Sequence, residues 1–203
     1  EFIAAARELC TQTGTLLILD EIQSGYGRSG KFYAHQHVTY NGEPLKADIV
    51  SMAKGIANGF PMGAIIISPQ IKPVYGMLGT TFGGNHLACA AALSTLKVLV
   101  KEKLTENAGI IGKYLKDELN KAAEAYIKEN GKSPFKEIRG IGLMIGIEME
   151  PEHQGLRNQL LFNENIFTGG AGKNVIRLLP PLCISKEEVN IFVAALKRCL
   201  KLG

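Results

Sequence analysis

The stretch LLILDEIQSGYGRSGKF, residues 16–32, decides how the first part of the chain folds. Its four aliphatic residues predict a short strand buried on both faces, and the run ends at Asp20 and Glu21. Ligands of open α/β sheets bind beyond the carboxyl ends of parallel strands, so a carboxylate at that place can meet a ligand. An acidic strand cap in a polar loop explains the same letters, and the stretch alone does not choose between the two interpretations.

Further helices and strands surround this stretch. Residues 2–13 predict a helix with one apolar face, and Gly14 ends it. The segments 47–53 and 63–68 predict two more aliphatic strands. Together these strands indicate a mostly parallel sheet of the α/β class. Because the chain begins without Met and already inside a helix, we expect it to be part of a longer protein.

The second half of the chain follows a different pattern. Helices are predicted over 86–104 and 105–130, and an antiparallel α+β arrangement is predicted after them. Its expected elements are strands at 138–150 and 175–182 and helices at 156–167 and 185–200, the last opened by a capping box of Ser185 and Glu188. We therefore expect two domains, residues 1–104 and residues 105–203.

The composition excludes several classes of protein. Lys and Arg number 23 against 19 Asp and Glu, but the charges are interspersed and lack the aromatic residues of a nucleic-acid surface. The four cysteines show no metal-binding or disulfide spacing, and His35 and His37 have no metal pattern beside them, so neither histidine is given a role. No apolar run approaches the roughly 18 residues of a membrane span. We expect a cytoplasmic protein without a metal, a nucleic-acid partner or a membrane anchor.

Asp20 and Lys54 are the first candidates for chemistry. Each follows a predicted core strand, so if the two strands share a sheet, an acid and an amine face the same crevice. Lys54 is followed by Gly55, which permits close approach of the backbone. The alternative is a surface lysine that happens to follow a strand.

Four ordered motifs then point to one family. DEIQSGYGRSG (20–30), SMAKGIANGFPMGA (51–64), GTTFGGNHLACAAA (79–92) and VIRLLPPL (175–182) closely resemble the class III pyridoxal-phosphate aminotransferases. The resemblance covers nearly the whole chain and is greatest to the acyl-ornithine branch, acetyl or succinyl. It implies the carboxyl-terminal half of the enzyme. That half comprises part of a fold-type I large domain with a mostly parallel sheet, followed by a small α+β carboxyl-terminal domain.

The resemblance assigns roles around the cofactor, pyridoxal 5'-phosphate. Asp20 would bond the pyridine nitrogen and keep it protonated, so that the ring withdraws electrons from the substrate. Ile22 would pack under the ring, and Gln23 would reach its phenolic oxygen. Lys54 would hold the cofactor as a Schiff base and afterwards move a proton between the substrate Cα and the cofactor C4′.

The resemblance also implies a dimer and a substrate anchor. Thr81, with Thr80 beside it, would reach the cofactor phosphate of the neighbouring subunit in a homodimer. The same turn can simply precede a helix capped by Asn85, and both can be true. Arg177 would hold a substrate carboxylate, where the planar guanidinium is favoured, although an ordinary surface ion pair is the alternative.

Some of the family pattern is changed or has no match. The family commonly has His before Gly-Thr-Thr and Pro after Gly-Gly-Asn, where this chain has Leu78 and His86, so this loop departs from the family pattern. The phosphate-cupping Gly-Ser-x-Ala turn, the aromatic residue stacked on the cofactor and the Glu partner of Arg177 have no counterpart. We therefore expect the 203 residues alone to be weakly active or inactive.

The implied reaction is transfer of an ω-amino group from an acyl-ornithine to 2-oxoglutarate in arginine biosynthesis. Nearby alternatives are an ornithine or GABA aminotransferase and a glutamate-semialdehyde aminomutase. A non-catalytic scaffold that retains the fold is the alternative from another class. A scaffold has no need for Asp20, Gln23, Lys54 and Thr81 together, which favours the enzyme.

Overall fold

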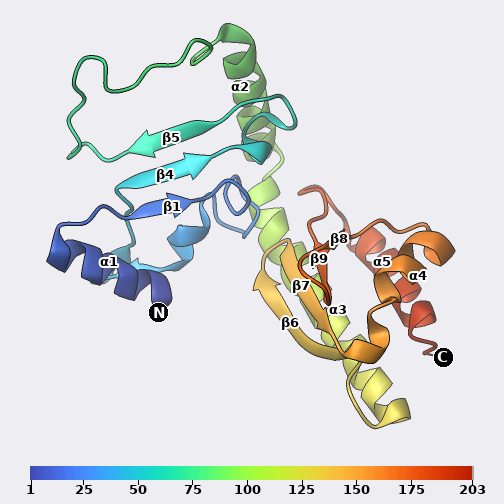
Figure 1. The fold of residues 1–203 in the computed structure, drawn as a ribbon. Coiled ribbons are helices and arrows are strands. Elements are labelled where there is room, and N and C mark those ends of the chain that lie inside the picture. Colours follow the sequence, from blue (N-terminus) through green and yellow to red (C-terminus); the bar gives the residue numbers. More distant parts are fainter. Residues whose placement is uncertain (203) are drawn as a thin grey trace. The chain divides into compact units, whose positions relative to one another are not determined.

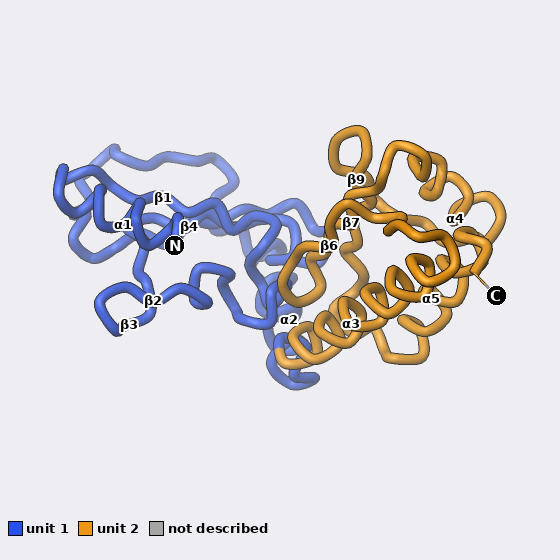
Figure 2. The backbone as a smooth tube through the Cα atoms, turned by 90° about the horizontal axis from the view of Figure 1, so that it is seen from below, with its two compact units in different colours: residues 1–105 blue, residues 106–203 orange. Residues whose placement is uncertain are grey.

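A computed structural model describes residues 1–202. The chain divides into two compact units, Glu1–Thr105 and Glu106–Gly203, shown in different colours in Figure 2. We refer to them as unit 1 and unit 2 and describe each by itself. Within residues 1–202, none of the helices has the length and apolar character needed to cross a bilayer.

Unit 1 is built around a three-stranded sheet with the order β1-β4-β5 (Figure 1). Its elements are α1 (Phe2–Thr13), β1 (Ile18–Asp20), η1 (Ala34–His37), the hairpin β2 (Thr39–Tyr40) and β3 (Glu43–Pro44), β4 (Ile49–Met52), η2 (Lys54–Ala57), β5 (Ala64–Ile67) and α2 (His86–Lys101). As predicted, α1 ends at Gly14, which has the left-handed φ of 69°.

The direction of β5 differs from the sequence prediction. β1 and β4 are parallel, but β5 runs antiparallel to β4, so the sheet is mixed rather than mostly parallel. A parallel return needs a crossover of about a dozen residues or more, usually containing a helix. The segment 53–63 contains only the short η2, so the chain turns back directly.

The expectation that residues 16–19 form a strand buried on both faces is wrong. Leu17 is buried, but Ile18 is 59% exposed and Leu16 is also exposed. Unit 1 keeps a small buried cluster of Val50, Met52, Ile56 and Ala57. Other large apolar side chains of α1, β5 and α2 stay exposed because no layer within residues 1–202 covers them, among them Phe2, Leu9, Ile65, Ile66, Leu87, Leu93 and Val100.

Unit 2 contains a four-stranded antiparallel sheet with the order β6-β7-β9-β8. The long helix α3 (Leu104–Asn130) begins just before the unit and leads into it. The other elements are β6 (Phe135–Ile141), β7 (Met144–Met149), η3 (Pro151–His153), α4 (Leu156–Glu164), β8 (Gly169–Gly170), β9 (Val175–Leu178) and α5 (Lys186–Cys199). The antiparallel sheet and the capping box of Ser185 and Glu188 are confirmed.

One strand predicted in unit 2 is in fact a hairpin. Residues 138–150 divide between β6 and β7, which pair with each other and turn at Gly142. Gly142 has a φ of 57°, which costs glycine nothing. A Cβ placed on Gly112 of α3 would lie 2.0 Å from the Gly142 carbonyl oxygen, so the missing side chain lets the helix contact the turn.

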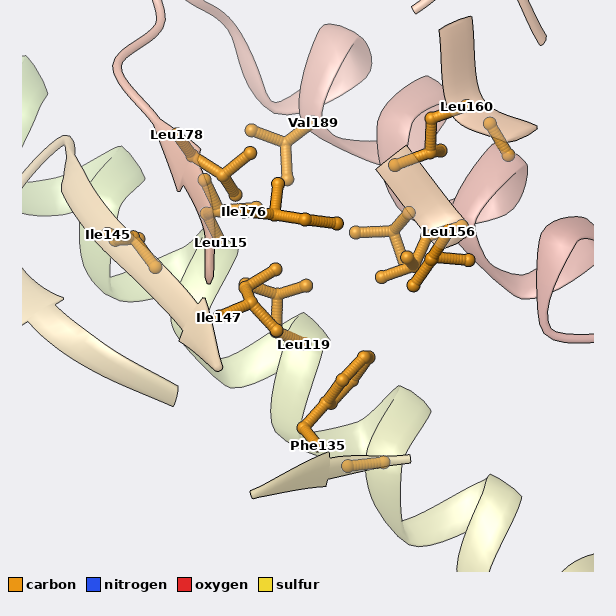
Figure 3. Close-up of a cluster of buried hydrophobic side chains, with 14 of the residues drawn as sticks. Leu115, Leu119, Phe135, Ile145, Ile147, Leu156, Leu160, Ile176, Leu178 and Val189 are labelled. Atoms are coloured by element: carbon orange, nitrogen blue, oxygen red, sulfur yellow. The ribbon is translucent and has the colours of Figure 1, made fainter. Parts of the chain in front are cut away.

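Unit 2 has a continuous apolar core, shown in Figure 3. Ile145 and Ile147 of β7 and Ile176 of β9 point from the sheet toward the helices, where Leu119 of α3 and Leu160 of α4 are also fully buried. Burying each such side chain contributes roughly 1.5–3 kcal/mol. The apolar alternation along β7 and β9 therefore fixes which face of the sheet turns inward.

Candidate functional site

Asp20 and Lys54 lie at the same edge of the unit 1 sheet. β1 and β4 are neighbours and parallel, and Asp20 is paired with Ser51, three residues before Lys54. The prediction that their strands share one sheet is confirmed. Both side chains follow the carboxyl ends of their strands and are exposed, so a ligand can reach an acid and an amine together.

The backbone of Lys54 has a conformation that the sequence did not predict. Its φ is 47°, in the left-handed region, which costs a residue with a Cβ about 1–2 kcal/mol. It opens the short helix η2, and the next residue, Gly55, lies against Tyr26, whose Cβ would be 3.6 Å from an added Cβ. Such uncommon backbone conformations cluster at functional sites.

Glu21, next to Asp20, is buried and accepts four hydrogen bonds. The donors are Ser24 Oγ at 2.6 Å, the Ala34 N–H at 3.0 Å, the His35 N–H at 2.9 Å and His35 Nδ1 at 3.0 Å. Burial by itself would raise the pKa of Glu21, but these hydrogen bonds outweigh it and lower the pKa to about 2. Glu21 thus ties the segment 24–35 to the end of β1.

A chain of contacts continues from His35 to the end of β4. The His35 ring stacks on Tyr33 with centroids 5.4 Å apart, and the Tyr33 hydroxyl donates to Met52 Sδ at 3.1 Å. Met52 precedes Lys54 by two residues. Glu21, His35 and Tyr33 therefore connect the strand ends that carry Asp20 and Lys54.

Sequence reasoning missed this connection and gave His35 no role. The available signal was an acid that follows Asp20 directly after an apolar strand, where burial of a carboxylate requires a partner. The partner is fourteen positions further along, in η1, a separation that no local pattern reveals. His37 lies elsewhere and contacts Ser29 through Nε2.

Ile22 and Gln23 follow the strand end directly. The Ile22 N–H donates to Asp20 Oδ1 at 2.9 Å, which orients the carboxylate and leaves its other oxygen without a partner in residues 1–202. Both side chains are half-buried beside the exposed Asp20. An apolar group and an amide thus stand next to the acid, as an aromatic ligand with polar substituents requires.

Thr80 and Thr81 lie in the exposed turn before α2. Thr80 lies so close to Gly83 that a Cβ there would overlap it, and the backbone N–H and side-chain Nδ2 of Asn85 both donate to the Phe82 carbonyl. Asn85 also caps α2 by accepting from the Ala88 N–H at 2.9 Å, which confirms the predicted N-cap. The two threonine hydroxyls are exposed and make no hydrogen bond within the described chain.

Arg177 belongs to unit 2, on the middle of β9. It is half-buried, and its Nε is buried without a hydrogen-bond acceptor among residues 1–202. It also lines a pocket of about 430 Å³ with mostly apolar walls, formed by residues including Ile166, Thr168, Leu179 and Phe192. A guanidinium without a partner beside such a pocket is suited to bind a carboxylate.

The donor set fits pyridoxal phosphate. Asp20 offers an anionic acceptor for a protonated ring nitrogen, Lys54 an accessible amine for an aldehyde, and Thr80 and Thr81 hydroxyls for a phosphate. The exposed acid and amine on adjacent parallel strands lie at the strand ends of a mixed α/β unit, where ligands of such sheets bind.

Comparison with known proteins identifies the family. The family described as Aminotransferase class-III matches residues 1–200. The chain belongs to the class III aminotransferases, a family of enzymes that depend on pyridoxal phosphate. The mixed α/β character of the chain agrees with this family.

Individual relatives support the same assignment. Acetylornithine aminotransferase from Bacillus subtilis (strain 168) is 41% identical over 98% of this chain and 49% of the relative. N-acetylornithine aminotransferase from Stenotrophomonas maltophilia K279a matches 98% of this chain and 50% of its own, with a TM-score of 0.78 and 32% identity. The chain spans about half the length of the curated relatives it matches.

A third relative is described with the cofactor. It is an ornithine aminotransferase from Toxoplasma gondii, whose structure has partial occupancy of PLP at the active site. The TM-score is 0.81 at 31% identity, over 98% of this chain and 46% of the relative.

Proposed function

We propose that the protein to which this chain belongs is a pyridoxal-phosphate aminotransferase in which Asp20 and Lys54 serve the cofactor. The observation that carries the proposal is the pairing of β1 with β4 in parallel, which brings an acid and an amine to one edge of the sheet. Bound pyridoxal phosphate would supply an electron-withdrawing ring that makes the substrate Cα–H acidic.

In this proposal each residue of unit 1 has a specific task. Asp20 accepts a hydrogen bond from the protonated ring nitrogen, and its orientation is fixed by the Ile22 N–H. Ile22 packs against the ring, and Gln23 donates to its phenolic oxygen. Lys54 holds the cofactor through Nζ and, once released, carries the proton that the substrate loses and regains.

Thr80 and Thr81 complete the proposed cofactor site. Their free hydroxyls, in a turn closed by Gly83 and Asn85, are suited to donate to a phosphate. We propose that Thr81 does so across a homodimer interface. Unit 1 would then be part of the large cofactor-binding domain, and unit 2 the small carboxyl-terminal domain.

Arg177 would hold the carboxylate of an amino or keto acid substrate. We propose ω-amino transfer from an acyl-ornithine to 2-oxoglutarate, as a step of arginine biosynthesis in the cytoplasm. The names of the B. subtilis and S. maltophilia relatives support this substrate. Transfer from free ornithine is the second candidate, favoured by the fold similarity to the T. gondii ornithine aminotransferase.

Covalent trapping tests the cofactor assignment. The protein is incubated with pyridoxal phosphate, reduced with borohydride and digested, and the modified lysine is found by mass spectrometry. We expect the label on Lys54, its loss in Lys54→Ala and its retention in Lys46→Ala, because Lys46 is also exposed but lies before β4.

The possible results of trapping separate the alternatives. Labelling spread over the surface lysines of the complete protein, with no preference for Lys54, would contradict the proposal and favour a scaffold. The same experiment on the 203 residues alone would show whether the Asp20–Lys54 edge binds the cofactor without further chain. We expect transamination by these residues alone to be weak or absent.

A further inference from the structure

The outer face of the unit 2 sheet carries two arginines and two glycines in one row. Arg139 of β6 is paired with Gly146 of β7, Gly146 with Arg177 of β9, and Arg177 with Gly169 of β8. Directly paired residues of antiparallel strands project to the same face. Each arginine therefore has a glycine beside it in the row.

The two arginines of this row have opposite surroundings. Arg139 Nη1 lies 2.7 Å from a carboxylate oxygen of Glu137 and 2.7 Å from one of Glu148, and Lys136 also contacts Glu148 at 3.1 Å. Arg177 has no carboxylate within ion-pair distance among residues 1–202, and its buried Nε has no acceptor. The acids of this face are thus occupied around Arg139, and Arg177 remains available for an anion.

The space for the Arg177 side chain depends on Gly169. A Cβ added to Gly169 would lie 3.4 Å from Arg177 Nε and 3.6 Å from Nη2, and 3.2 Å from the Arg177 carbonyl oxygen. The guanidinium therefore lies across the strand position that a larger residue would fill. The tight contact is the one to the Arg177 carbonyl oxygen, so alanine would require β8 or β9 to shift by a few tenths of an ångström, and its methyl group would lie in van der Waals contact with the guanidinium.

We infer that Gly169 is a positioning residue for the substrate carboxylate, because it sets where the Arg177 guanidinium lies. The inference rests on the proposed role of Arg177. Hydrogen bonds between a guanidinium and a carboxylate depend on the alignment of two planar groups. A methyl group at position 169 would move one of those planes without removing its charge, so carboxylate affinity would fall while the cofactor site in unit 1 stays intact.

The neighbouring glycine provides a matched control. Gly170 lies on the same strand but projects to the opposite face, where an added Cβ would lie 2.9 Å from Arg157 Nη1. That atom belongs to an exposed side chain whose Nε donates to the Thr168 carbonyl at 3.2 Å, so the Arg157 guanidinium would have to shift. Gly170→Ala thus makes the same chemical change in β8 without touching Arg177.

The experiment measures binding of glutarate, a simple dicarboxylate, to the holoprotein by calorimetry. We expect Gly169→Ala to raise the Kd about tenfold, the effect of weakening a charged hydrogen bond, and Gly170→Ala to leave it within about twofold. The visible absorption of the cofactor should be the same in both variants, because the change lies outside unit 1. Arg177→Lys should also raise the Kd.

The combined results separate this inference from the proposed function. If Arg177→Lys weakens glutarate binding but Gly169→Ala does not, the role of Gly169 is overturned and that of Arg177 stands. If neither variant has an effect, both assignments are overturned. Should Gly169→Ala lower thermal stability, glutarate binding is compared at a temperature at which both glycine variants are fully folded. Unchanged affinity of the folded Gly169→Ala variant would contradict the inference.

Discussion

Unit 1 and unit 2 differ in the size of their buried apolar cores. Unit 2 buries the apolar faces of its sheet and helices in one core, whereas unit 1 has a small cluster around Val50 and Met52 and leaves much apolar surface exposed. All of the candidate cofactor residues nevertheless lie in unit 1. The unit with the candidate cofactor residues is therefore held mainly by local polar contacts, and the unit with the large core carries Arg177, the candidate carboxylate anchor.

The largest effect is expected when an isoleucine is replaced by alanine in each unit in turn. Ile147→Ala in unit 2 should lower the free energy of unfolding by about 2–5 kcal/mol, because the side chain is fully buried. Ile66→Ala in unit 1 should lower it by less than about 1 kcal/mol, since Ile66 is 49% exposed. Hydrogen exchange followed by mass spectrometry reports each unit separately. Equal losses in the two units would show that unit 1 is packed more tightly than its exposed surface indicates.

A smaller effect is expected from the polar contacts of unit 1. Glu21→Gln removes the charge that four donors face, and we expect it to destabilise unit 1 by about 2 kcal/mol near neutral pH. The Glu21 pKa is lowered on folding from near 4.5 to about 2, so its stabilisation is complete above about pH 4.5 and is lost as the pH falls toward 2.

The pH dependence supplies the control for Glu21. Hydrogen exchange of β1 and η1 measured at a series of pH values should show protection falling between pH 4.5 and 2 in the wild type and a weaker trend in Glu21→Gln. Exchange in β7 serves as an internal reference. A pH response of β1 that is unchanged by the substitution would mean that another group holds the segment.

The smallest expected effect compares two helix caps. Ser185 accepts from the Glu188 N–H at 3.2 Å in unit 2, and Asn85 accepts from the Ala88 N–H at 2.9 Å in unit 1. Ser185→Ala should lower the free energy of unfolding of unit 2 by about 1 kcal/mol. Asn85→Ala should lower the stability of α2 by a similar amount. Urea unfolding combined with segment-resolved exchange distinguishes the two. An Asn85→Ala variant whose α2 exchanges as slowly as in the wild type would contradict the capping role of Asn85.

The sequence predicted those features that local chemistry determines. Gly14, Asn85 and Ser185 mark helix ends through their own conformation or side-chain bonds, and the structure places the helix ends there. The placement of Asp20 and Lys54 at one edge was predicted on the condition that their strands share a sheet, and the parallel pairing of β1 with β4 meets that condition. These predictions needed no knowledge of distant contacts.

The features that were missed depend on contacts between distant segments. The exposure of Ile18 is decided by what packs alongside it, which apolar periodicity cannot show. The direction of β5 and the turn at Gly142 depend on how strands pair, which the apolar runs by themselves do not specify. For the same reason no local pattern indicated that His35 is the partner of the buried Glu21. The left-handed backbone of Lys54 also arises from its surroundings, since lysine does not favour it.

The left-handed backbone at Lys54 determines which substitutions this position tolerates. Glycine would adopt the same φ of 47° without the steric cost, so lysine at this position works against folding. Asp20 is different, because its carboxylate accepts the Ile22 N–H and helps to shape the turn. Where selection acts on folding alone and not on the proposed cofactor role, replacement of Lys54 should therefore be tolerated better than replacement of Asp20. A substitution scan that measures only protein abundance would detect this difference.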